Sequence, residues 1–309
     1  MMASEGKVKK LPPSPGGLGS PLGDALRALR PHQWLKNVLI GVPAIAAHQT
    51  ALEPIGQLLL AAIVFSLCAS AGYVLNDLFD REHDRKHPRK KNRPFAAGAL
   101  SPIFGAILSI GLLIAALTIS IVLLPRSFSA VLCGYFALTL FYSAYLKQLL
   151  MIDVVVLACL YGLRVVAGGV AIGIPLSEWL IAFCIFFFIS LALVKRSAEI
   201  KSALEVSTQL PGRGYKTEDL PIVLALAGAS GFVSVLVLAL YLDSENVRAM
   251  YSHPTALWGV GLVLVFWIGR VVLIAGRGDM HDDPVVFAVT DKISLLSAMA
   301  AGAVLILSV

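Results

Sequence analysis

Charged residues are scarce in this chain. Asp, Glu, Lys and Arg make up 14% of its 309 residues, against roughly 25% in an average soluble protein. Hydrophobic residues account for 58%, and the mean hydropathy is +0.82. A soluble domain cannot bury so much apolar surface, so the composition predicts an all-α polytopic membrane protein.

Cysteine is also rare. The four cysteines, Cys68, Cys133, Cys159 and Cys184, lie inside apolar stretches and show neither C-x-x-C nor Cys/His spacing. This pattern disfavours a zinc site or a disulfide framework and is typical of packing residues. The sequence also lacks an obvious Ser/His/Asp or Cys/His constellation for nucleophilic catalysis.

The first residues lack the uninterrupted apolar core of a secretory signal. They are instead basic and then rich in Pro, Gly and Ser from Leu11 to Gly23. We therefore expect residues 1–24 to form a disordered cytoplasmic tail and residues 25–309 to form a single transmembrane helical catalytic domain.

Apolar segments separated by short polar breaks predict nine membrane-spanning helices. If the N-terminus is cytoplasmic, the connections on that side carry most of the Lys and Arg, while the opposite loops contain only Arg126 and Arg248. This asymmetry predicts the orientation. The net charge is +6, and the basic residues cluster at helix ends. This indicates lipid headgroups and phosphorylated substrates rather than nucleic acid as partners. The predicted spans are 32–50, 55–80, 102–124, 128–146, 151–172, 177–195, 220–242, 254–275 and 286–308.

An acidic motif ends the second predicted span. Asn76, Asp77, Asp80 and Asp84 form an N-D-x-x-D-x-x-x-D run, and on a helix the three aspartates share one face and can hold a divalent metal together. Mg²⁺ is usually held by one or two carboxylates plus substrate phosphates, so we expect Mg²⁺ with a diphosphate. Imidazole is a poor ligand for such an oxygen-rich site, which argues against the neighbouring histidines as ligands.

A basic run follows the acidic motif directly. It includes Lys90, Lys91 and Arg93, whose side chains can bind phosphate. The alternative is a solvated charged loop that merely obeys the positive-inside rule. We favour a site, because a simple loop has no need of three carboxylates on one helix face.

Other polar clusters lie at the predicted cytoplasmic ends of different spans, and a bundle would gather them around one cavity. Lys36 begins the first span, Tyr142 and Lys147 end the fourth, and the run from Lys195 through Arg196 to Glu199 ends the sixth. Each has a simpler alternative: Tyr is common at membrane interfaces, and Lys and Arg there can reach the headgroups or obey the positive-inside rule.

Arg164 differs because it lies well inside the fifth predicted span. A cation there is tolerated only if it is paired or faces a wet cavity. We treat it as a site residue, with pairing to Asp153 or to an acid of another helix as the structural alternative. Gly162, Gly168 and Gly169 in the same span indicate close helix packing. Near the C-terminus, Asp282 or Asp283 before Pro284 is typical of a capped helix start.

These motifs resemble a known family. N-D-L-F-D-R-E-H-D at 76–84 resembles the first aspartate-rich motif of the UbiA-type intramembrane prenyltransferase superfamily, and segments 30–37, 76–100, 163–169, 174–179 and 195–199 resemble decaprenyl-phosphate phosphoribosyltransferases. The resemblance implies nine helices around a central cavity open to the cytoplasmic side of a bacterial inner membrane, and it allows a homo-oligomer.

One departure distinguishes between branches of the superfamily. Members that prenylate aromatic rings typically carry a second acidic motif, D-x-x-x-D, after the sixth span, whereas this chain has K-R-S-A-E at 195–199. Two cations suit a second phosphate, which favours transfer of a 5-phosphoribosyl group from phosphoribosyl pyrophosphate to a polyprenyl phosphate lipid. Ser197 stands where that branch usually has Tyr, which leaves the acceptor contacts open.

The resemblance also implies roles for the candidate residues. Asp77, Asp80 and Asp84 would hold Mg²⁺, with Asn76 orienting them. The basic residues divide between the two phosphorylated substrates, and the sequence does not separate the sets: Lys90, Lys91 and Arg93 suit the donor, and Lys36, Arg164, Lys195 and Arg196 the acceptor.

Two alternatives remain at this point. The first is a prenyltransferase that acts on an aromatic quinone precursor. The second is a transporter or lipid-binding membrane protein in which the charges line a permeation path, and it is disfavoured because the charges concentrate on one side of the membrane.

Overall fold

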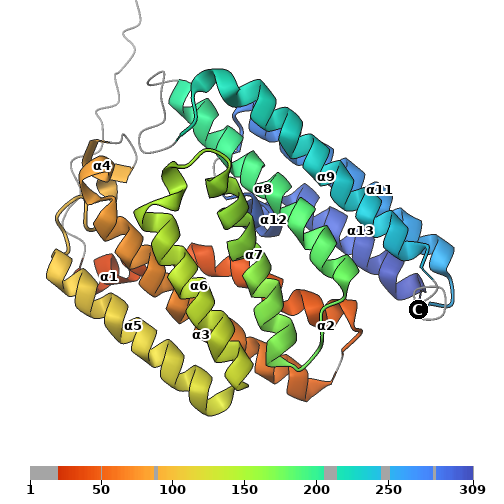
Figure 1. Ribbon diagram of the computed structural model, residues 1–309, viewed down its shortest axis with the longest axis horizontal. Coiled ribbons are helices and arrows are strands. Elements are labelled where there is room, and N and C mark those ends of the chain that lie inside the picture. The colour runs from red at the N-terminus through yellow and green to blue at the C-terminus, as the bar shows by residue number, and fades with distance from the viewer. Residues whose placement is uncertain are drawn as a thin grey trace, which may run out of the picture.

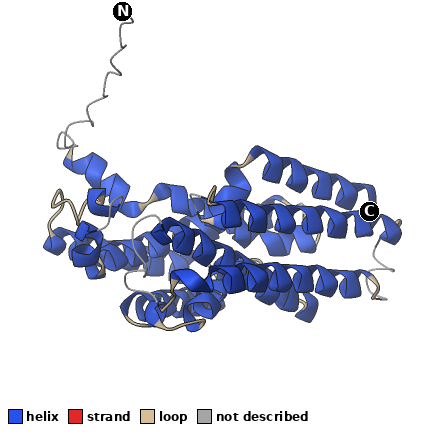
Figure 2. Cartoon of the chain, turned by 90° about the horizontal axis from the view of Figure 1, so that it is seen from above, coloured by secondary structure: helices blue, strands red, loops and turns tan. Residues whose placement is uncertain are grey.

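The computed structural model describes residues 20–49, 51–86, 90–204, 214–244, 251–280 and 283–308. Every element in these residues is a helix, as Figure 2 shows. The expected disordered tail, 1–24, lies mostly outside the described residues, but helix α1 already begins at Pro21. The elements are α1 Pro21–Leu29, η1 Pro31–Gly41, α2 Val42–Ala46, α3 Leu52–Phe79, α4 Arg81–Lys86, η2 Lys90–Asn92, α5 Pro102–Leu123, α6 Arg126–Ala144, η3 Leu146–Gln148, α7 Ile152–Ala171, α8 Glu178–Leu204, η4 Thr217–Asp219, α9 Leu220–Leu242, η5 Pro254–Leu257, α11 Trp258–Arg277, α12 Pro284–Thr290 and α13 Lys292–Ser308.

The predicted count of nine spans is not confirmed. Within the described residues, seven helices are long and apolar enough to cross a membrane, or eight if the bent pair α12 and α13 counts as one span. The first predicted span, 32–50, consists of the 3₁₀ helix η1 followed by the five-residue α2. Pro43 lies at the start of α2 and cannot donate a backbone hydrogen bond, which accounts for the break between the two helices.

The bundle is organised around α7. Its most apolar stretch is 67% buried, against 17% for α5. Figure 1 shows α7 in the middle of the bundle and α5 at its edge, where exposed apolar residues suit contact with lipid. Two hydrophobic cores meet on α7: one with α3 and α6 around Phe65 and Phe128, and one with α8 and α11 around Phe188 and Ile268. A helix hydrophobic on all sides is expected in such a central position.

Glycines allow η1 to approach α7 closely. A Cβ at Gly168 would lie 2.0 Å from the carbonyl oxygen of Ile40, and one at Gly169 would lie 2.9 Å from that of Ile174. A Cβ at Gly162 would meet nothing within 4 Å. The predicted close helix packing is therefore confirmed for Gly168, whereas Gly169 packs against the loop that follows its own helix and a Cβ at Gly162 has no close neighbour.

Hydrogen bonds attach the N-terminal segment to α3. The Trp34 indole donates to the Ser70 hydroxyl at 2.9 Å, and the Asn37 amide donates to the Ser66 hydroxyl at 2.8 Å. Between α1 and η1 the chain turns at Arg30, whose φ of 53° is left-handed. This turn brings the start of η1 beside the polar end of α3.

The last span is bent by 76° between α12 and α13. Arg270 of α11 forms a bidentate ion pair with Asp291 at the bend, with contacts of 2.7 and 3.1 Å. The same carboxylate accepts the backbone N–H of Ser294 at 2.8 Å and so begins α13. At the other end of α12, Asp283 accepts the backbone N–H of Val285 at 3.2 Å, which confirms the predicted capped helix start.

Candidate active site

A cavity of about 830 Å³ opens at the end of the bundle where α3 terminates. It gathers side chains from η1, α3, α6, α7, α8 and the residue before α12. Most of the predicted site residues line it, so the polar clusters that are distant in the sequence do meet. These lining residues are Lys36, Asn76, Asp77, Asp80, Lys90, Arg93, Tyr142, Arg164, Lys195 and Glu199.

Two arginines neutralise the first aspartate of the acidic motif. Asp77 is buried, and its Oδ1 lies 2.5 Å from Arg30 Nη2 and 3.1 Å from Arg93 Nη1. The same Arg93 nitrogen lies 2.5 Å from Oδ2 of Asp84. Asp77 and Asp84 thus converge on a single cationic nitrogen. We call Asp77, Asp84, Arg30 and Arg93 the acid–arginine group.

Asp80 points to a different partner, the amine of Lys147, which follows α6. Helix α3 ends at Phe79, and Asp80 has φ −86° and ψ 0°, so the helical phase is interrupted within the motif. The prediction that all three aspartates share one helix face is therefore wrong. In the described part of the chain, no three acidic, His or Cys side chains are grouped closely enough to hold a metal ion together.

The donor set still fits a divalent cation. Two carboxylates, Asp77 and Asp84, lie together beside the cavity: they share Arg93, and Asp77 also pairs with Arg30. Hard oxygen ligands of this kind suit Mg²⁺ when phosphate oxygens complete its coordination. Asp80, whose side chain is 27% exposed, lines the same cavity.

A second charged group surrounds Asp283, the residue before α12. Its Oδ2 lies 2.7 Å from Lys36 Nζ and 3.0 Å from Lys195 Nζ, and it accepts the Tyr161 hydroxyl at 2.8 Å. Burial alone would raise the pKa of Asp283, but the charges of Lys36 and Lys195 and the hydrogen bonds from Lys36 and Tyr161 lower it below its usual value. Asp283 is therefore ionised at neutral pH. We call Lys36, Lys195, Tyr161 and Asp283 the lysine group.

Arg164 lies deeper in the cavity. Its side chain donates to Asn37 at 3.1 Å, to the Tyr135 hydroxyl at 2.9 Å and to the carbonyl of Leu160. The alternative prediction, pairing with Asp153, is wrong. Arg164 instead lines the polar cavity, as expected for a cation inside a span.

Arg196 is not in the cavity. Its side chain is fully buried and forms ion pairs with Asp153, 2.6 Å away, and with Glu199. Asp153 also accepts the Tyr215 hydroxyl at 2.8 Å; burial, together with that bond, raises the pKa of Tyr215 and keeps it neutral. Consecutive helical residues point about 100° apart, so Lys195 faces the cavity and Arg196 cannot. Its assignment to the acceptor phosphate is thus corrected.

The other predicted cations differ in position. Lys90 lines the cavity, whereas Lys91 is exposed and does not. Lys147 does not line it either and reaches it through Asp80. Residues that the sequence did not single out as site residues are Arg30, Tyr161 and Asp283. The sequence indicates Asp283 only as a helix cap, although it lies on the same predicted side as the cations.

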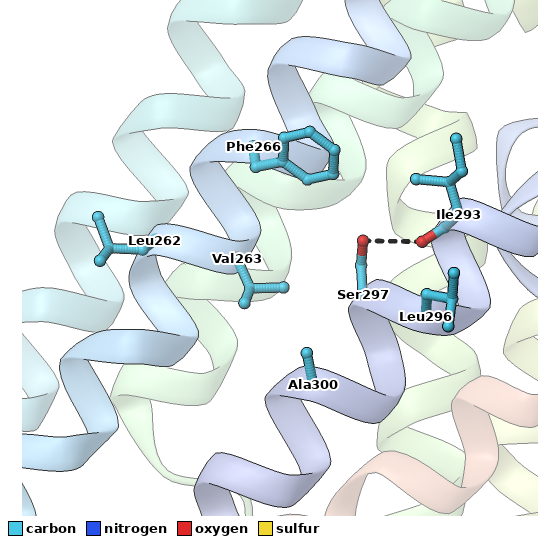
Figure 3. A pocket seen from close by; sticks show the side chains of 7 residues that line it. All are labelled: Leu262, Val263, Phe266, Ile293, Leu296, Ser297 and Ala300. Atoms are coloured by element: carbon cyan, nitrogen blue, oxygen red, sulfur yellow. Dashed lines mark hydrogen bonds between the residues drawn. The ribbon is translucent and has the colours of Figure 1, made fainter.

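A second hollow, of about 400 Å³, lies between α11 and α13 (Figure 3). Six of its seven lining residues are apolar, and the hydroxyl of Ser297 donates to the carbonyl of Ile293 at 2.8 Å. It has no charged or titratable side chain to bind a phosphorylated ligand, so the chemistry belongs to the charged cavity.

Bundle and cavity together define an integral membrane protein with a charged pocket at one end. A family model described as the UbiA prenyltransferase family matches residues 37–289. The chain belongs to this family, and it is therefore a membrane transferase.

Several known proteins are similar to the chain. Uncharacterized protein y4nM of Sinorhizobium fredii is 38% identical over 92% of this chain, and the match covers 55% of that protein's length. Nodulation protein NoeC of Azorhizobium caulinodans is 36% identical over 87% of this chain and 88% of its own length. Decaprenyl-phosphate phosphoribosyltransferase of Mycobacterium tuberculosis is 36% identical over 58% of this chain and 60% of its own. A solved UbiA homolog from Archaeoglobus fulgidus, bound to GPP and Mg²⁺, shares the fold with a TM-score of 0.67 at 16% identity, over 91% of this chain and 99% of that one.

Proposed function

We propose that the protein transfers a 5-phosphoribosyl group from phosphoribosyl pyrophosphate to a polyprenyl monophosphate. The C1–O bond to pyrophosphate breaks, a bond from a lipid phosphate oxygen to C1 forms, and pyrophosphate leaves. The relatives named decaprenyl-phosphate phosphoribosyltransferase, at 29–39% identity, support this reaction. The product would serve as a precursor of polyprenyl-linked, arabinose-type pentose donors.

The observation that carries the proposal is the lysine group. Lys36 and Lys195 reach the cavity from two elements and converge on one carboxylate oxygen, whereas a second metal site would need further acids there. Clustered ammonium groups suit a phosphate. A lipid phosphate acceptor needs such a site, but a neutral aromatic ring does not.

The acid–arginine group would bind the donor. Asp77 and Asp84, with Asp80 at the rim, would hold Mg²⁺, which neutralises the charge that develops on the leaving pyrophosphate. Arg30 and Arg93 lie beside these carboxylates and would bind phosphate oxygens directly, as would Lys90. Asn76 would orient the donor from the last turn of α3.

The acceptor requires little activation. A lipid phosphate is already ionised near neutral pH, so its attack on C1 needs no strong general base. This agrees with the lack of an obvious Ser/His/Asp or Cys/His constellation in the sequence. A single displacement of this kind inverts the configuration at C1. We place the cavity at the cytoplasmic face of a bacterial inner membrane, since the Lys and Arg residues concentrate at that end of the bundle.

The test uses purified protein in detergent with Mg²⁺, labelled phosphoribosyl pyrophosphate and polyprenyl phosphate, followed by lipid extraction. We expect the label to enter the organic phase and to stay in the aqueous phase when a chelator is added.

The second candidate, favoured by the family's name, is aromatic prenylation. Turnover of a prenyl diphosphate with an aromatic acid, without labelled lipid in the first assay, would replace the proposal with that one.

A further inference from the structure

The lysine group contains one anion that the acidic motif does not supply. Asp283 receives hydrogen bonds or ion pairs from three different elements: Lys36 from η1, Tyr161 from α7 and Lys195 from α8. All three donors meet on the same oxygen, Oδ2, within 3.0 Å, while Oδ1 caps α12. Asp283 is therefore the point at which four parts of the chain are joined inside the cavity.

The charges of this group do not balance. Among the described residues, Asp283 is the one carboxylate that forms an ion pair with Lys36 or with Lys195. The two ammonium groups therefore share one ion-pair partner, while the charge of Glu199 also acts on Lys195. An ammonium group has three protons to donate, so each lysine can bind Asp283 and still bind an arriving anion.

The broken span fixes Asp283 in this place. Helix α12 lies behind α7 and α8 in Figure 1, and Pro284 begins it directly after Asp283. The Arg270 and Asp291 ion pair holds the bend at its far end. A carboxylate on a short, clamped helix is a rigid anchor, whereas lysine side chains are flexible.

We propose that Asp283 is a positioning residue that holds Lys36 and Lys195 as a pair for the phosphomonoester of the lipid acceptor. The inference rests on the proposed function and deepens it, because it separates the acceptor subsite from the donor subsite. The donor side uses other carboxylates, Asp77 and Asp84. A change at Asp283 therefore alters binding of the acceptor and leaves binding of the donor unchanged.

The electrostatic contribution has its own signature. Burial, together with the charge of Lys195, lowers the pKa of Lys36. The charge of Asp283 and the nearby Tyr73 of α3 raise this pKa but do not fully offset the effect of burial. The Tyr161 ring lies under the same amine, 5.6 Å from its centroid. Without the carboxylate, the buried lysine loses its proton at lower pH, and a neutral amine binds phosphate poorly.

The experiment measures both KM values of Asp283→Asn. Asn keeps the size and the capping ability of Asp but not its charge. We expect the KM for polyprenyl phosphate to rise about tenfold or more. The KM for phosphoribosyl pyrophosphate should stay within about twofold of the wild-type value. The variant's KM for polyprenyl phosphate should also rise further as the pH is raised from about 7 to about 9. Asp283→Glu should recover part of the loss. Asp279→Asn, an exposed position four residues earlier, is the matched control and should behave as the wild type.

Three results would overturn the inference: unchanged KM values, tighter binding of the acceptor, or an equal loss for both substrates. Tighter binding would mean that Asp283 competes with the phosphate.

If Asp283→Asn does not fold, Lys195→Gln replaces it, because the Lys195 side chain is partly exposed. The same selective loss of acceptor binding is expected. Failure of the proposed function is distinguishable, because then the wild type itself forms no labelled lipid. Direct binding of polyprenyl phosphate to the wild type and to Asp283→Asn tests the positioning role without turnover.

Discussion

Arg196 and Asp153 form an ion pair in which both side chains are completely buried, with Nη2 2.6 Å from Oδ2. The pair joins the polar end of α8 to the start of α7. The hydroxyl of Tyr215, beyond α8, donates to the same carboxylate. The Arg196 guanidinium lies over the Tyr215 ring, 5.4 Å from the ring centroid. This network stabilises the bundle beside the cavity but does not face into it.

Arg196→Met should destabilise the protein strongly. Loss of the guanidinium leaves the Asp153 carboxylate buried without a cation, which costs about 3–5 kcal/mol. Thermal unfolding in detergent measures this loss. The neighbouring variant Lys195→Met is the matched comparison: it should melt close to the wild type and lose affinity for the acceptor. If Arg196→Met instead melted normally and lost only acceptor affinity, Arg196 would be a substrate-binding residue after all.

Gly168→Ala should also destabilise the bundle. Its new Cβ would lie 2.0 Å from the Ile40 carbonyl oxygen, so η1 would have to move away from α7. Overpacking of this kind costs about 1–3 kcal/mol. Gly162→Ala in the same helix meets nothing within 4 Å and should melt at or slightly above the wild-type temperature. Equal melting temperatures for the two variants would contradict the close approach.

Asp80→Asn is the cleanest test of the acidic motif. Asp77 is 2% exposed and holds two arginines, so its replacement disturbs folding as well, whereas the Asp80 side chain is 27% exposed. We expect Asp80→Asn to lower kcat about 100-fold or more with little change in melting temperature. Glu53→Gln, at the opposite end of α3, is the control. Wild-type turnover by Asp80→Asn would exclude a role for this carboxylate in the chemistry.

Arg270→Met should weaken acceptor binding from a distance. Loss of the bidentate contact with Asp291 loosens the bend that carries Asp283 into the cavity. The KM for polyprenyl phosphate should rise, by less than in Asp283→Asn, and the KM for the donor should not change. Arg277→Met, an exposed position in the last turn of the same helix, provides the comparison. An effect on donor binding alone would show that the bend serves another purpose.

Much of the fold follows from hydropathy alone. The predicted spans 102–124 and 151–172 correspond to Pro102–Leu123 and Ile152–Ala171. Hydropathy was less informative where a helix continues beyond the membrane: α8 was predicted to end at 195 but extends to Leu204. Polar residues such as Lys and Glu are good helix formers, so the end of an apolar run is not the end of the helix.

The site was only partly predictable. The acidic motif and Lys36 are recognisable from residue type and place in the chain; Lys36, Asn76, Asp77 and Asp80 line the cavity, whereas Asp84 lies beside it. Asp283 was not recognised because its partners come from η1, α7 and α8, which local spacing cannot relate to it. The two neighbours Lys195 and Arg196 look equivalent in the sequence, and only the packing of α8 distinguishes the cation that faces the cavity from the fully buried one.

The acid–arginine group has a consequence for how ligands enter. Asp77, Asp84 and Asp80 already have the positive partners Arg30, Arg93 and Lys147. Under the proposed function, a bare divalent ion must compete with those cations, and a bare diphosphate must approach those carboxylates. If both arrived together, the carboxylates would pair with the cation and the arginines with the diphosphate, so that no charge would be left alone. Each ligand would then strengthen the other's affinity by the same factor, and the pocket would favour the preformed complex over either component by itself.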